Sequence, residues 1–378
     1  MYDTDVLVVG AGPTGLTVAA ALAARGRAVV VVDQQTAGAN TSRAAAINAR
    51  TLEVLDDLDV SRRLVTQGRP LPRFSIRDHR RTLMTLDFSV LPTSFPYTLG
   101  IPQSVTEALL HERLVELGGG LSRPRTVRTV AQDAAGATAT FDDGDRLRAR
   151  YVVGADGMHS RVRDQAGIGF GGGAYAESFV LADVRLTGDA PADEVILFWA
   201  RAGLTVLAPL PDGVHRVVAP VPDAPEQVSA GFVQALLDER GLGAGRLVVT
   251  EVVWSSRFRI HHRVADTYRA GRLLLAGDAA HVHSPAGGQG MNLGIQDAVV
   301  LAEALAAALG GDETLLDIYS AARRPVAQQV VSLTDRLTRL ATLPAAARPV
   351  RNLLIGVAGH SPRVRRTLTW RLSGLVYR

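Results

Sequence analysis

The start of the chain constrains the fold more than any other stretch. Residues 4–9, "TDVLVV", form a short apolar run typical of a buried strand, and a glycine-rich turn follows at once. Residues 14–26 then have helical spacing and end at a glycine, and "AVVVVD" (28–33) has the pattern of a second strand. A strand, a helix and a strand in so short a span predict a right-handed crossover and hence a parallel sheet.

The turn itself has a spacing with chemical meaning. Gly10, Gly12 and Gly15 follow the pattern G-x-G-x-x-G. The first glycine permits a tight turn, the second lets the backbone approach a pyrophosphate, and the third lets helix and strand pack closely. Asp33 closes the second strand, where an acid can accept hydrogen bonds from a ribose. The turn predicts a dinucleotide site but does not separate NAD from FAD.

The rest of the chain alternates between helical and strand-like sequence patterns. Helices are expected at 48–66, 104–117, 228–240, 292–309 and 314–340. Between 171 and 265, alternating apolar segments separated by Gly, Pro and Asp predict an antiparallel sheet, and 72–99 has the same pattern. The segment "AGRLLLAGD" then returns to a buried parallel strand. We therefore expect an α/β fold, in which a Rossmann-type unit is interrupted by a β-rich unit.

These patterns predict residue boundaries for three parts. The expected dinucleotide-binding domain comprises 1–71, 100–170 and 266–335, the β-rich substrate domain comprises 72–99 and 171–265, and a helical C-terminal segment comprises 336–378.

Composition excludes several classes of function. The 378 residues are 47% hydrophobic and contain no cysteine, which excludes disulfides, thiolate metal sites and cysteine nucleophiles. All 41 basic residues are arginine, they are balanced by 37 acids, and they form no concentrated stripe of the kind that binds nucleic acid. No run approaches the roughly 18 apolar residues of a membrane span, and no signal pattern begins the chain, so we expect a cytoplasmic protein.

The C-terminal stretch 363–378 leaves two interpretations. It can form an amphipathic basic helix on a membrane surface, or a terminal helix that packs Leu368, Leu372 and Leu375 onto the body with its arginines outward. We favour the second.

Two later segments show a resemblance to a known family. "YVVGADGMHSRVR" (151–163) resembles the DG motif, and "RLLLAGDAAHVHSPAGGQGMNLGIQDA" (272–298) resembles the GD motif, of group A flavoprotein aromatic monooxygenases. These para-hydroxybenzoate-hydroxylase-like enzymes carry one FAD in a single Rossmann-type domain. The order of the motifs and the β-rich insertion also match, over roughly residues 2–335. The resemblance therefore implies FAD rather than NAD as the bound dinucleotide.

The resemblance also implies a set of cofactor-binding residues. They are Gly10, Gly12, Pro13, Gly15, Asp33, Arg43, Gln103, Val127, Asp156, Asp278, Pro285, Gly288, Gly290, Met291 and Asn292. In the family, the positions of Arg43 and Gln103 contact the flavin's linker, that of Val127 meets the adenine, and that of Asp278 binds the ribityl chain. The amides of 288–292 would face the pyrimidine edge of the flavin. Asp156 is associated with both FAD and the reduced nicotinamide.

Two departures from the family pattern stand out. Asp33 is followed by Gln34, where the family often has Glu followed by Arg or Lys. Many polyketide hydroxylases of the family also carry a C-terminal thioredoxin-like domain, and the 378 residues end too early for one, so we expect a short form.

The family chemistry implies the reaction. NADH or NADPH would reduce FAD when substrate is present, and the reduced flavin would capture O₂ as a C4a-hydroperoxyflavin that hydroxylates an electron-rich ring. Pro285 and Arg43 match the family positions nearest the chemistry. The residues Phe198, Trp199, Leu207, His215, Arg216 and Phe258 are candidates for lining the substrate site, although alternation alone buries one face of a sheet and half or more of them can be core.

The substrate class and the alternatives follow from the same resemblance. Segments around 74–103 and 254–272 look most like hydroxylases of fused-ring aromatic polyketides, so we expect a polycyclic phenol or quinone as substrate and a monomer or homodimer. A tetracycline-type inactivating oxygenase or a Baeyer–Villiger enzyme is an alternative of the same fold. A FAD-binding protein without oxygenase turnover is an alternative of another class.

Two further patterns are expected to carry no chemistry of their own. His281 and His283 lie two residues apart, but a metal site would need a third converging ligand, so no metal is expected. Asp156, His159 and Ser160 lie too close in sequence for a hydrolase triad. A flavin-dependent halogenase is excluded, since the chain has no lysine.

Overall fold

The computed structural model of this chain describes residues 2–38, 44–222, 224–225 and 227–377. The predicted unit at the start of the chain is present as strand β1 (Thr4–Val9), helix α1 (Pro13–Ala23) and strand β2 (Val29–Val32), with the two strands parallel. The valine-rich strands are buried on nearly every residue, as expected of strands covered on both faces. The glycine turn therefore lies at the carboxyl end of a buried parallel strand.

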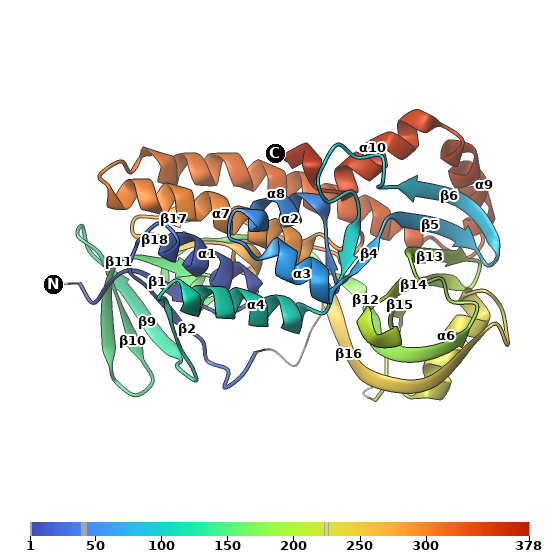
Figure 1. Ribbon diagram of the computed structural model, residues 1–378, viewed down its shortest axis with the longest axis horizontal. Helices are drawn as coiled ribbons and strands as arrows, with labels where there is room; N and C mark the ends of the chain where they lie inside the picture. Colours follow the sequence, from blue (N-terminus) through green and yellow to red (C-terminus); the bar gives the residue numbers. More distant parts are fainter. Residues whose placement is uncertain (1, 39–43, 223, 226, 378) are drawn as a thin grey trace.

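A first sheet extends this unit on both sides (Figure 1). Its order is β17-β18-β11-β1-β2-β8, with β8 (Gly120–Ser122), β11 (Arg146–Gly154), β17 (Arg269–Ala270) and β18 (Leu273–Leu275). All neighbours are parallel except β17 and β18. Strands β9 (Val127–Gln132) and β10 (Ala137–Phe141) continue antiparallel from β11. The strand before the GD motif thus joins the same parallel sheet as β1.

Helices pack on this sheet. They are α2 (Ala49–Asp56), α3 (Ser61–Gln67), α4 (Gln103–Glu116), α5 (Arg161–Gln165), α7 (Gly290–Leu309) and α8 (Thr314–Ala341). The single helix expected at 48–66 is instead two helices, because the chain turns at Asp59, whose φ of 58° is left-handed. Helix α7 has the length and hydropathy of a membrane span, but 72% of its apolar window is buried in the protein, so it is a core helix of this unit.

A second sheet forms the β-rich part (Figure 1). Its order is β19-β16-β12-β15-β14-β13-β5-β6, with β5 (Arg73–Asp78), β6 (Arg81–Asp87), β12 (Phe170–Gly188), β13 (Glu194–Ala200), β14 (Gly203–Pro209), β15 (Val214–Val221), β16 (Leu247–Ala265) and β19 (His281–Val282). Every pair is antiparallel except β13 and β5. The segments expected at 72–99 and 171–265 therefore share one sheet, and β19 joins it from the GD motif.

Short elements connect the two sheets. Strands β3 (Ala46–Ile47), β4 (Arg69–Leu71) and β7 (Thr98–Gly100) form a small third sheet, and single 3-10 turns lie at η1 (Pro211–Gly213), η2 (Gly277–Ala279) and η3 (Leu375–Tyr377). Helix α6 (Ala230–Arg240) covers one face of the second sheet with Val233 and Leu237.

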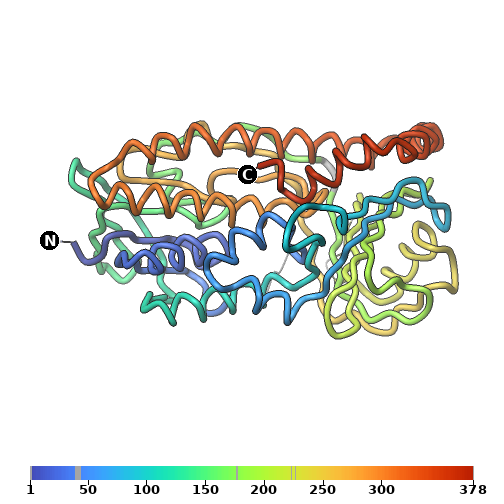
Figure 2. Tube along the Cα trace, turned by 45° about the horizontal axis from the view of Figure 1, so that its top comes forward, coloured from blue at the N-terminus to red at the C-terminus, as the bar shows by residue number. Residues whose placement is uncertain are grey.

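The C-terminal segment is helical. Helices α9 (Arg348–Gly359) and α10 (Pro362–Leu372) pack on β6 at one end of the molecule (Figure 2). Leu368, Leu372 and Leu375 pack into a cluster with Leu86 and Phe88. The interpretation of 363–378 as a helix that packs its leucines onto the body is confirmed.

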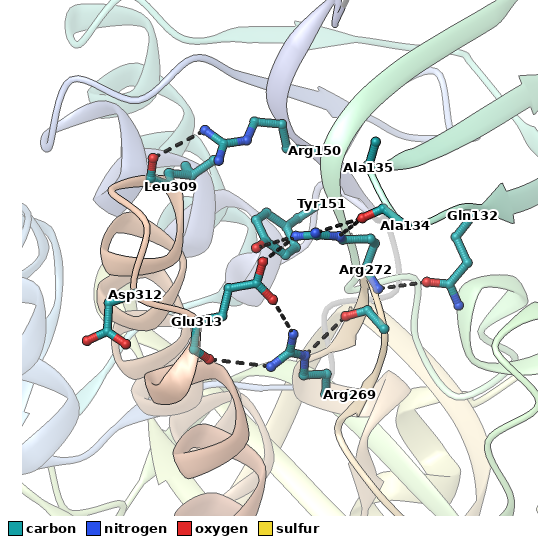
Figure 3. Close-up of polar contacts among 12 residues, drawn as sticks. Gln132, Ala134, Ala135, Arg150, Tyr151, Arg269, Arg272, Leu309, Asp312 and Glu313 are labelled. Atoms are coloured by element: carbon teal, nitrogen blue, oxygen red, sulfur yellow. Dashed lines mark hydrogen bonds and ion pairs between the residues drawn. The ribbon is translucent and has the colours of Figure 1, made fainter.

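The turn between α7 and α8 is fastened to the edge of the first sheet by an arginine–glutamate network (Figure 3). The Glu313 carboxylate accepts from Arg269 Nη2 at 2.8 Å and from Arg272 Nη1 at 2.7 Å. Arg272 also donates to the Tyr151 hydroxyl at 2.6 Å and to the Ala134 carbonyl at 2.8 Å. This network ties β17, β18 and β11 to the start of α8, and so fixes where the two long helices lie.

Candidate flavin site

The glycine turn is held against the DG motif by close backbone contacts. Gly10 has a φ of +105°, and a Cβ there would lie 2.2 Å from the Ala155 carbonyl oxygen. A Cβ on Gly15 would lie 1.9 Å from the Gly10 carbonyl oxygen. No side chain fits at either position, since real Cβ atoms essentially never approach this closely. These glycines bring the first turn of α1 and the end of β11 together.

The GD motif docks on the same helix. A Cβ on Gly277, whose φ is +63°, would lie 2.6 Å from Thr14 Oγ1. A Cβ on Gly294, in α7, would lie 2.4 Å from the same atom. The Thr14 side chain therefore fits between the GD turn and α7. As a result, the three motifs that the sequence shows far apart meet around the start of α1.

Gly12 is different, because a Cβ there would meet no atom within 4 Å. Gly12 is the N-cap of α1 and offers no side-chain cap, and Pro13 follows it as the first helical residue. The first backbone amides of α1 consequently have no acceptor from an N-cap side chain. An uncapped helix N-terminus with room beside its second glycine fits a pyrophosphate, whose oxygens would accept from these amides.

Asp33 lies beside this turn. Its carboxylate accepts from the Ala11 amide at 2.7 Å and from the Gln35 amide at 2.8 Å. Because each carboxylate oxygen has two lone pairs, it can still accept from a ribose hydroxyl. The Arg125 amide donates to the Asp33 carbonyl at 2.6 Å, and this contact brings the start of β9, with buried Val127, to the same place. Residues matched to the adenosine end thus lie together.

Gln103 begins α4 next to the segment that follows Arg43. Its Oε1 accepts from the Ala44 amide at 3.3 Å, and its Nε2 donates to Glu107 Oε1 at 2.7 Å. Arg43 itself lies outside the described residues. Asp278 is exposed in η2, in the turn that Gly277 makes possible. The residue therefore lies at the protein surface near the end of β18.

The loop before α7 presents backbone rather than side chains. Pro285 and Gly288 are exposed, and the Gly288 amide donates to the Pro285 carbonyl at 2.9 Å. Gly287 and Gly288 both have positive φ, of 81° and 64°, so they make the tight turn that leads into the helix. Gly290 and Met291 follow, half-buried, and α7 begins without a side-chain cap. The first amides of α7 can therefore stabilise a negatively charged ligand edge.

Asn292 does not point its side chain at a ligand. It is buried; its Oδ1 accepts from the Asn48 amide at 2.8 Å, and its Nδ2 donates to the carbonyls of Ala46 at 2.9 Å and Gly288 at 2.6 Å. Asn292 thus fastens the loop before α7 to the start of α2. The sequence analysis missed Asn48, although its place before a helical stretch is that of an N-cap, which it fills by accepting from the Thr51 amide.

Asp156 organises the DG segment. Its Oδ2 accepts from the amides of Arg161 at 2.8 Å and Val162 at 3.2 Å, and Ser160 caps the same helix by accepting from the Arg163 amide at 3.0 Å. Burial raises the pKa of Asp156, and these hydrogen bonds oppose the rise only in part. Both side chains are therefore engaged in capping α5, which explains their close spacing without a hydrolase triad.

The two histidines of the GD motif have separate partners. His281 Nε2 lies 2.7 Å from Asp297 Oδ2, and Arg323 Nε lies 2.5 Å from Asp297 Oδ1, all of them buried. Burial would raise the pKa of Asp297, but the charge of Arg323 and the contact with His281 outweigh it and lower that pKa. His283 instead pairs its Nδ1 with the Ser284 carbonyl at 2.8 Å. Among the described residues, no three His, Asp or Glu side chains gather as metal ligands.

Strand pairing divides the candidate substrate residues between two faces. Phe198 and Leu207 belong to the buried cluster under α6, and His215 shares their face because it pairs with Val184 of that cluster. Phe198 and Leu207 are therefore core residues, the alternative that the alternation had left open, and His215 also faces away from the other side of the sheet. We drop these three from the substrate site.

The opposite face carries Trp199, Arg216 and Phe258. Trp199 is covered by Arg351 of α9, whose guanidinium lies 4.9 Å from the ring centroid. Arg216 is buried and forms two hydrogen bonds of 2.7 Å with Asp183. Phe258 is half-buried and stacks with Phe179, with 6.0 Å between the ring centroids. Half-buried neighbours on this face, which the sequence analysis did not single out, are Leu197, Val206, Val218, Trp254 and Ser256.

A cleft of about 890 Å³ lies between the two parts of the molecule. The first part contributes the end of α3, the start of β4, and Pro102 and Val105 around the start of α4. The β-rich part contributes Asp183 and Val214, together with η1 and its neighbours. The volume is within the usual range for small-molecule sites, and a cleft between domains is a common place for one.

A parallel sheet with a dinucleotide turn, an uncapped α7 start beside it and an interdomain cleft define a dinucleotide-dependent enzyme of two units. Residues 3–334 match the family described as FAD binding domain. The chain therefore belongs to this family of group A flavin-dependent monooxygenases, as the resemblance implied, and FAD is the family's cofactor.

Individual relatives agree with this placement. The chain is 39% identical over 358 residues to 6-methylpretetramide 4-monooxygenase of Streptomyces rimosus, covering 92% of this chain and 64% of that protein. The structure of the anhydrotetracycline hydroxylase OxyS from Streptomyces rimosus superposes with a TM-score of 0.82 and 36% identity, covering 98% of this chain and 76% of the other. The structure of the p-nitrophenol 4-monooxygenase PnpA from Pseudomonas putida DLL-E4 superposes with a TM-score of 0.84 and 28% identity, covering 99% of each chain. This chain thus spans about two thirds of the first of these relatives.

Proposed function

We propose that this chain is an FAD-dependent, NAD(P)H-consuming monooxygenase that hydroxylates a polycyclic aromatic substrate. The observation that carries the proposal is the meeting of three motifs around Gly12, where a Cβ would meet no other atom. The same molecule has an interdomain cleft of about 890 Å³, a volume that suits a small-molecule substrate. A protein that only stored FAD would have no need of a second cavity of this size.

The proposed cofactor residues divide by the part of FAD they would hold. The turn at Gly10, Gly12, Pro13 and Gly15 would hold the pyrophosphate, Asp33 and Val127 the adenosine, Arg43, Gln103 and Asp278 the linker and ribityl chain, and Pro285, Gly288, Gly290, Met291 and Asn292 the flavin edge. The fit rests on the uncapped starts of α1 and α7 and on the surface position of Asp278. Asp156 would act through the DG backbone, which it caps.

When bound, FAD supplies the redox chemistry, since it accepts a hydride from NADH or NADPH and activates O₂. The chain's own residues bind, orient and exclude water. The exposed residue Pro285 and the first amides of α7 would lie along the reactive edge. On the other side, the face with Phe258, Trp254 and the Asp183–Arg216 pair would hold the aromatic rings, with the pair fixed by its two short hydrogen bonds.

The substrate class follows from the cleft and from the relatives. The relatives named for pretetramide and anhydrotetracycline act on fused rings, and the face opposite α6 carries aromatic side chains such as Trp254 and Phe258. The p-nitrophenol enzyme acts on a single ring. We propose a fused-ring phenol or quinone as substrate, and a cytoplasmic enzyme that is a monomer or homodimer.

A substrate panel tests the proposal. The purified protein, loaded with FAD, would be mixed with NADH or NADPH and with anthraquinones, angucyclinones, tetracyclines and p-nitrophenol in ¹⁸O₂. At least one fused-ring compound should accelerate NAD(P)H oxidation and gain one ¹⁸O atom as a hydroxyl group.

Other outcomes contradict parts of the proposal. A ring-expanded lactone would show a Baeyer–Villiger enzyme, and turnover of p-nitrophenol alone would refute the fused-ring class. Tight FAD binding without acceleration by any compound would favour a binding protein, and a colourless protein that cannot be reconstituted would refute the flavin assignment itself.

A further inference from the structure

Helix α9 exposes large apolar side chains that an ordinary surface helix would bury. Its four large aliphatic side chains Val350, Leu353, Leu354 and Val357 are between 60% and 66% exposed. Their spacing of three, four and seven residues places them on one stripe of the helix. The two fully buried residues of the same helix, Arg351 and Asn352, are polar. An exposed apolar stripe of this kind on an otherwise well-packed protein marks an interaction site.

The orientation of α9 is fixed by hydrogen bonds rather than left to chance. Arg351 is buried, and it donates to the carbonyls of Trp199 at 3.0 Å, Leu340 at 3.1 Å and Ala341 at 3.1 Å. The neighbouring Asn352 donates to the Trp199 carbonyl and to Asp78 Oδ2, each at 2.9 Å. Rotating the helix to bury its leucines would break all of these contacts and leave the buried charge of Arg351 without partners. The packing of Arg351 and Asn352 therefore keeps the aliphatic stripe on the outer side of the helix.

The charge around the stripe is one-sided. Residues 336–378 contain nine arginines and no Asp or Glu, whereas all 37 acidic residues lie earlier in the chain. Arg363, Arg365 and Arg366 begin α10 immediately after α9, and all three are exposed. Within the described part of the chain, none of these three has an acidic partner within ion-pair distance. The surface thus combines aliphatic side chains with unpaired guanidinium groups.

We propose that the stripe of α9 together with the first turn of α10 docks on an anionic phospholipid bilayer. Arginine binds phosphate groups through several N–H donors, and aliphatic side chains partition into the boundary between headgroups and acyl chains. Figures 1 and 2 place α9 at one end of the long axis of the molecule. The contact is peripheral, since α9 and α10 lie on the body rather than crossing a bilayer.

A second copy of this chain fits the surface less well. A two-fold interface uses the same patch on both subunits, so one built from 336–378 would gather arginines of both copies with no acidic residue to pair with them. A specific dimer also needs about 800 Å² and some 20 residues from each partner, more than a four-residue stripe supplies. A peptide that binds as a helix would need an apolar groove, whereas the four aliphatic side chains form an exposed stripe on a single helix. Charge and shape therefore both favour a lipid surface.

Vesicle flotation tests the proposal with the full FAD-loaded chain. The protein should float with vesicles of phosphatidylcholine and phosphatidylglycerol, and much less with phosphatidylcholine alone or in 0.5 M NaCl. Leu354→Asp should lower the partition coefficient at least about tenfold, because a charge would enter the apolar boundary. The double change Arg365→Gln with Arg366→Gln should lower it roughly 25-fold, about fivefold for each arginine.

The matched control is Ile318→Asp. Ile318 is 55% exposed on α8, far from α9, so this variant should float like the unmodified protein. Melting temperature and flavin absorbance, measured for every variant, show that each is folded. The proposal is refuted if the unmodified chain fails to float, if neutral vesicles serve equally well, or if the variants of α9 and α10 behave like Ile318→Asp. A dimer that Leu354→Asp dissociates, without flotation, would assign the stripe to a second copy instead.

Discussion

At the scale of single residues, the glycines divide into those that the fold requires and one that it does not. Gly10, Gly15, Gly277 and Gly294 have no room for a Cβ, because another atom of the protein lies less than 3 Å from where it would stand. A Cβ on Gly12 would have no other atom within 4 Å, although Gly12 belongs to the same motif as Gly10 and Gly15. The space beside Gly12 is therefore free for a ligand, and a side chain there should affect the ligand and not the fold.

Gly12→Ala tests this distinction. The φ of −74° at Gly12 suits alanine, so the FAD-free variant should melt within a few degrees of the unmodified protein. Its affinity for FAD should fall at least about tenfold, because the methyl group blocks the approach of the pyrophosphate to the backbone. Flavin fluorescence titration measures the affinity. Gly120→Ala, at a site in β8 that is equally open, should leave it unchanged; equal FAD affinity in both variants would show that the pyrophosphate binds elsewhere.

His283 gives the protein a pH dependence of predictable sign. Burial lowers its pKa to about 4, from 6.5. The folded protein therefore binds fewer protons than the unfolded chain between these two values, so stability falls as the pH falls from 6.5 towards 4. The burial of neutral His215 and His261, whose pKa values are also lowered, adds to the same trend.

His283→Asn should flatten this dependence in part. The asparagine amide can keep donating to the Ser284 carbonyl, which His283 Nδ1 now contacts at 2.8 Å, but it does not titrate. Melting temperatures at pH 7, 6 and 5 measure the effect. His360→Asn is the matched control, because His360 is exposed at the end of α9. An unchanged slope in His283→Asn would mean that His283 is as basic when folded as when unfolded.

At the scale of elements, the sequence predicts the parts whose signal is local. The structure confirms the βαβ unit, helix α4 and the long helices α7 and α8. Apolar periodicity and the motif glycines specify these elements over a few turns. The single helix expected at 48–66 is wrong, because one left-handed residue, Asp59, was not visible in the helical pattern. Helix α9 has the periodicity of a surface helix, but its direction depends on Trp199 and Asp78, which are far away in the sequence.

The faces of the second sheet show the same limit. Alternation tells that Phe198 and Trp199 point to opposite sides, but only pairing with β14 and the place of α6 tell which side is core. Of the six candidate substrate residues, Trp199, Arg216 and Phe258 lie on the face opposite α6, and Arg351 of α9 covers Trp199. The FAD residues stay a prediction, but they rest on a motif, which fixes both residue type and position, whereas a substrate face is specified by the whole sheet.

The element that joins α7 to α8 offers a direct test of one ion-pair network. Glu313 is held by Arg269, Arg272 and Tyr151; burial would raise its pKa, but these contacts lower it. Glu313→Gln should cost about 1 kcal/mol, and so lower the melting temperature by roughly 2 °C, since its side chain is 43% exposed and solvent screens it. Asp317→Asn is the control, because Asp317 meets the same Arg269 while 79% exposed and should change nothing measurable. Equal losses would place the stability in Arg269 alone.

At the scale of the whole molecule, the two sheets divide the work. Several residues proposed for FAD lie at the carboxyl ends of the parallel strands, and those proposed for the substrate lie on one face of the antiparallel sheet. The cleft is lined by residues of both parts, among them Pro102 and Asp183. Because separate cores support the two parts, changes on one should leave the binding function of the other intact. Two phenylalanines of the second sheet, on opposite faces, allow this separation to be measured.

Phe258→Ala removes half of a stacked pair from the open face. It should lower kcat/KM for the fused-ring substrate about tenfold or more and release more H₂O₂ per NAD(P)H, since the rings are held less well and water enters, while FAD affinity stays unchanged. Phe198→Ala leaves a cavity under α6 and should cost about 3–5 kcal/mol of stability. Its remaining folded fraction should keep kcat/KM near normal. Steady-state kinetics, peroxide assays and thermal melts distinguish the two variants. If Phe198→Ala impaired coupling and Phe258→Ala only stability, the substrate would lie on the α6 side of the sheet, and the cleft between the two parts would serve another purpose.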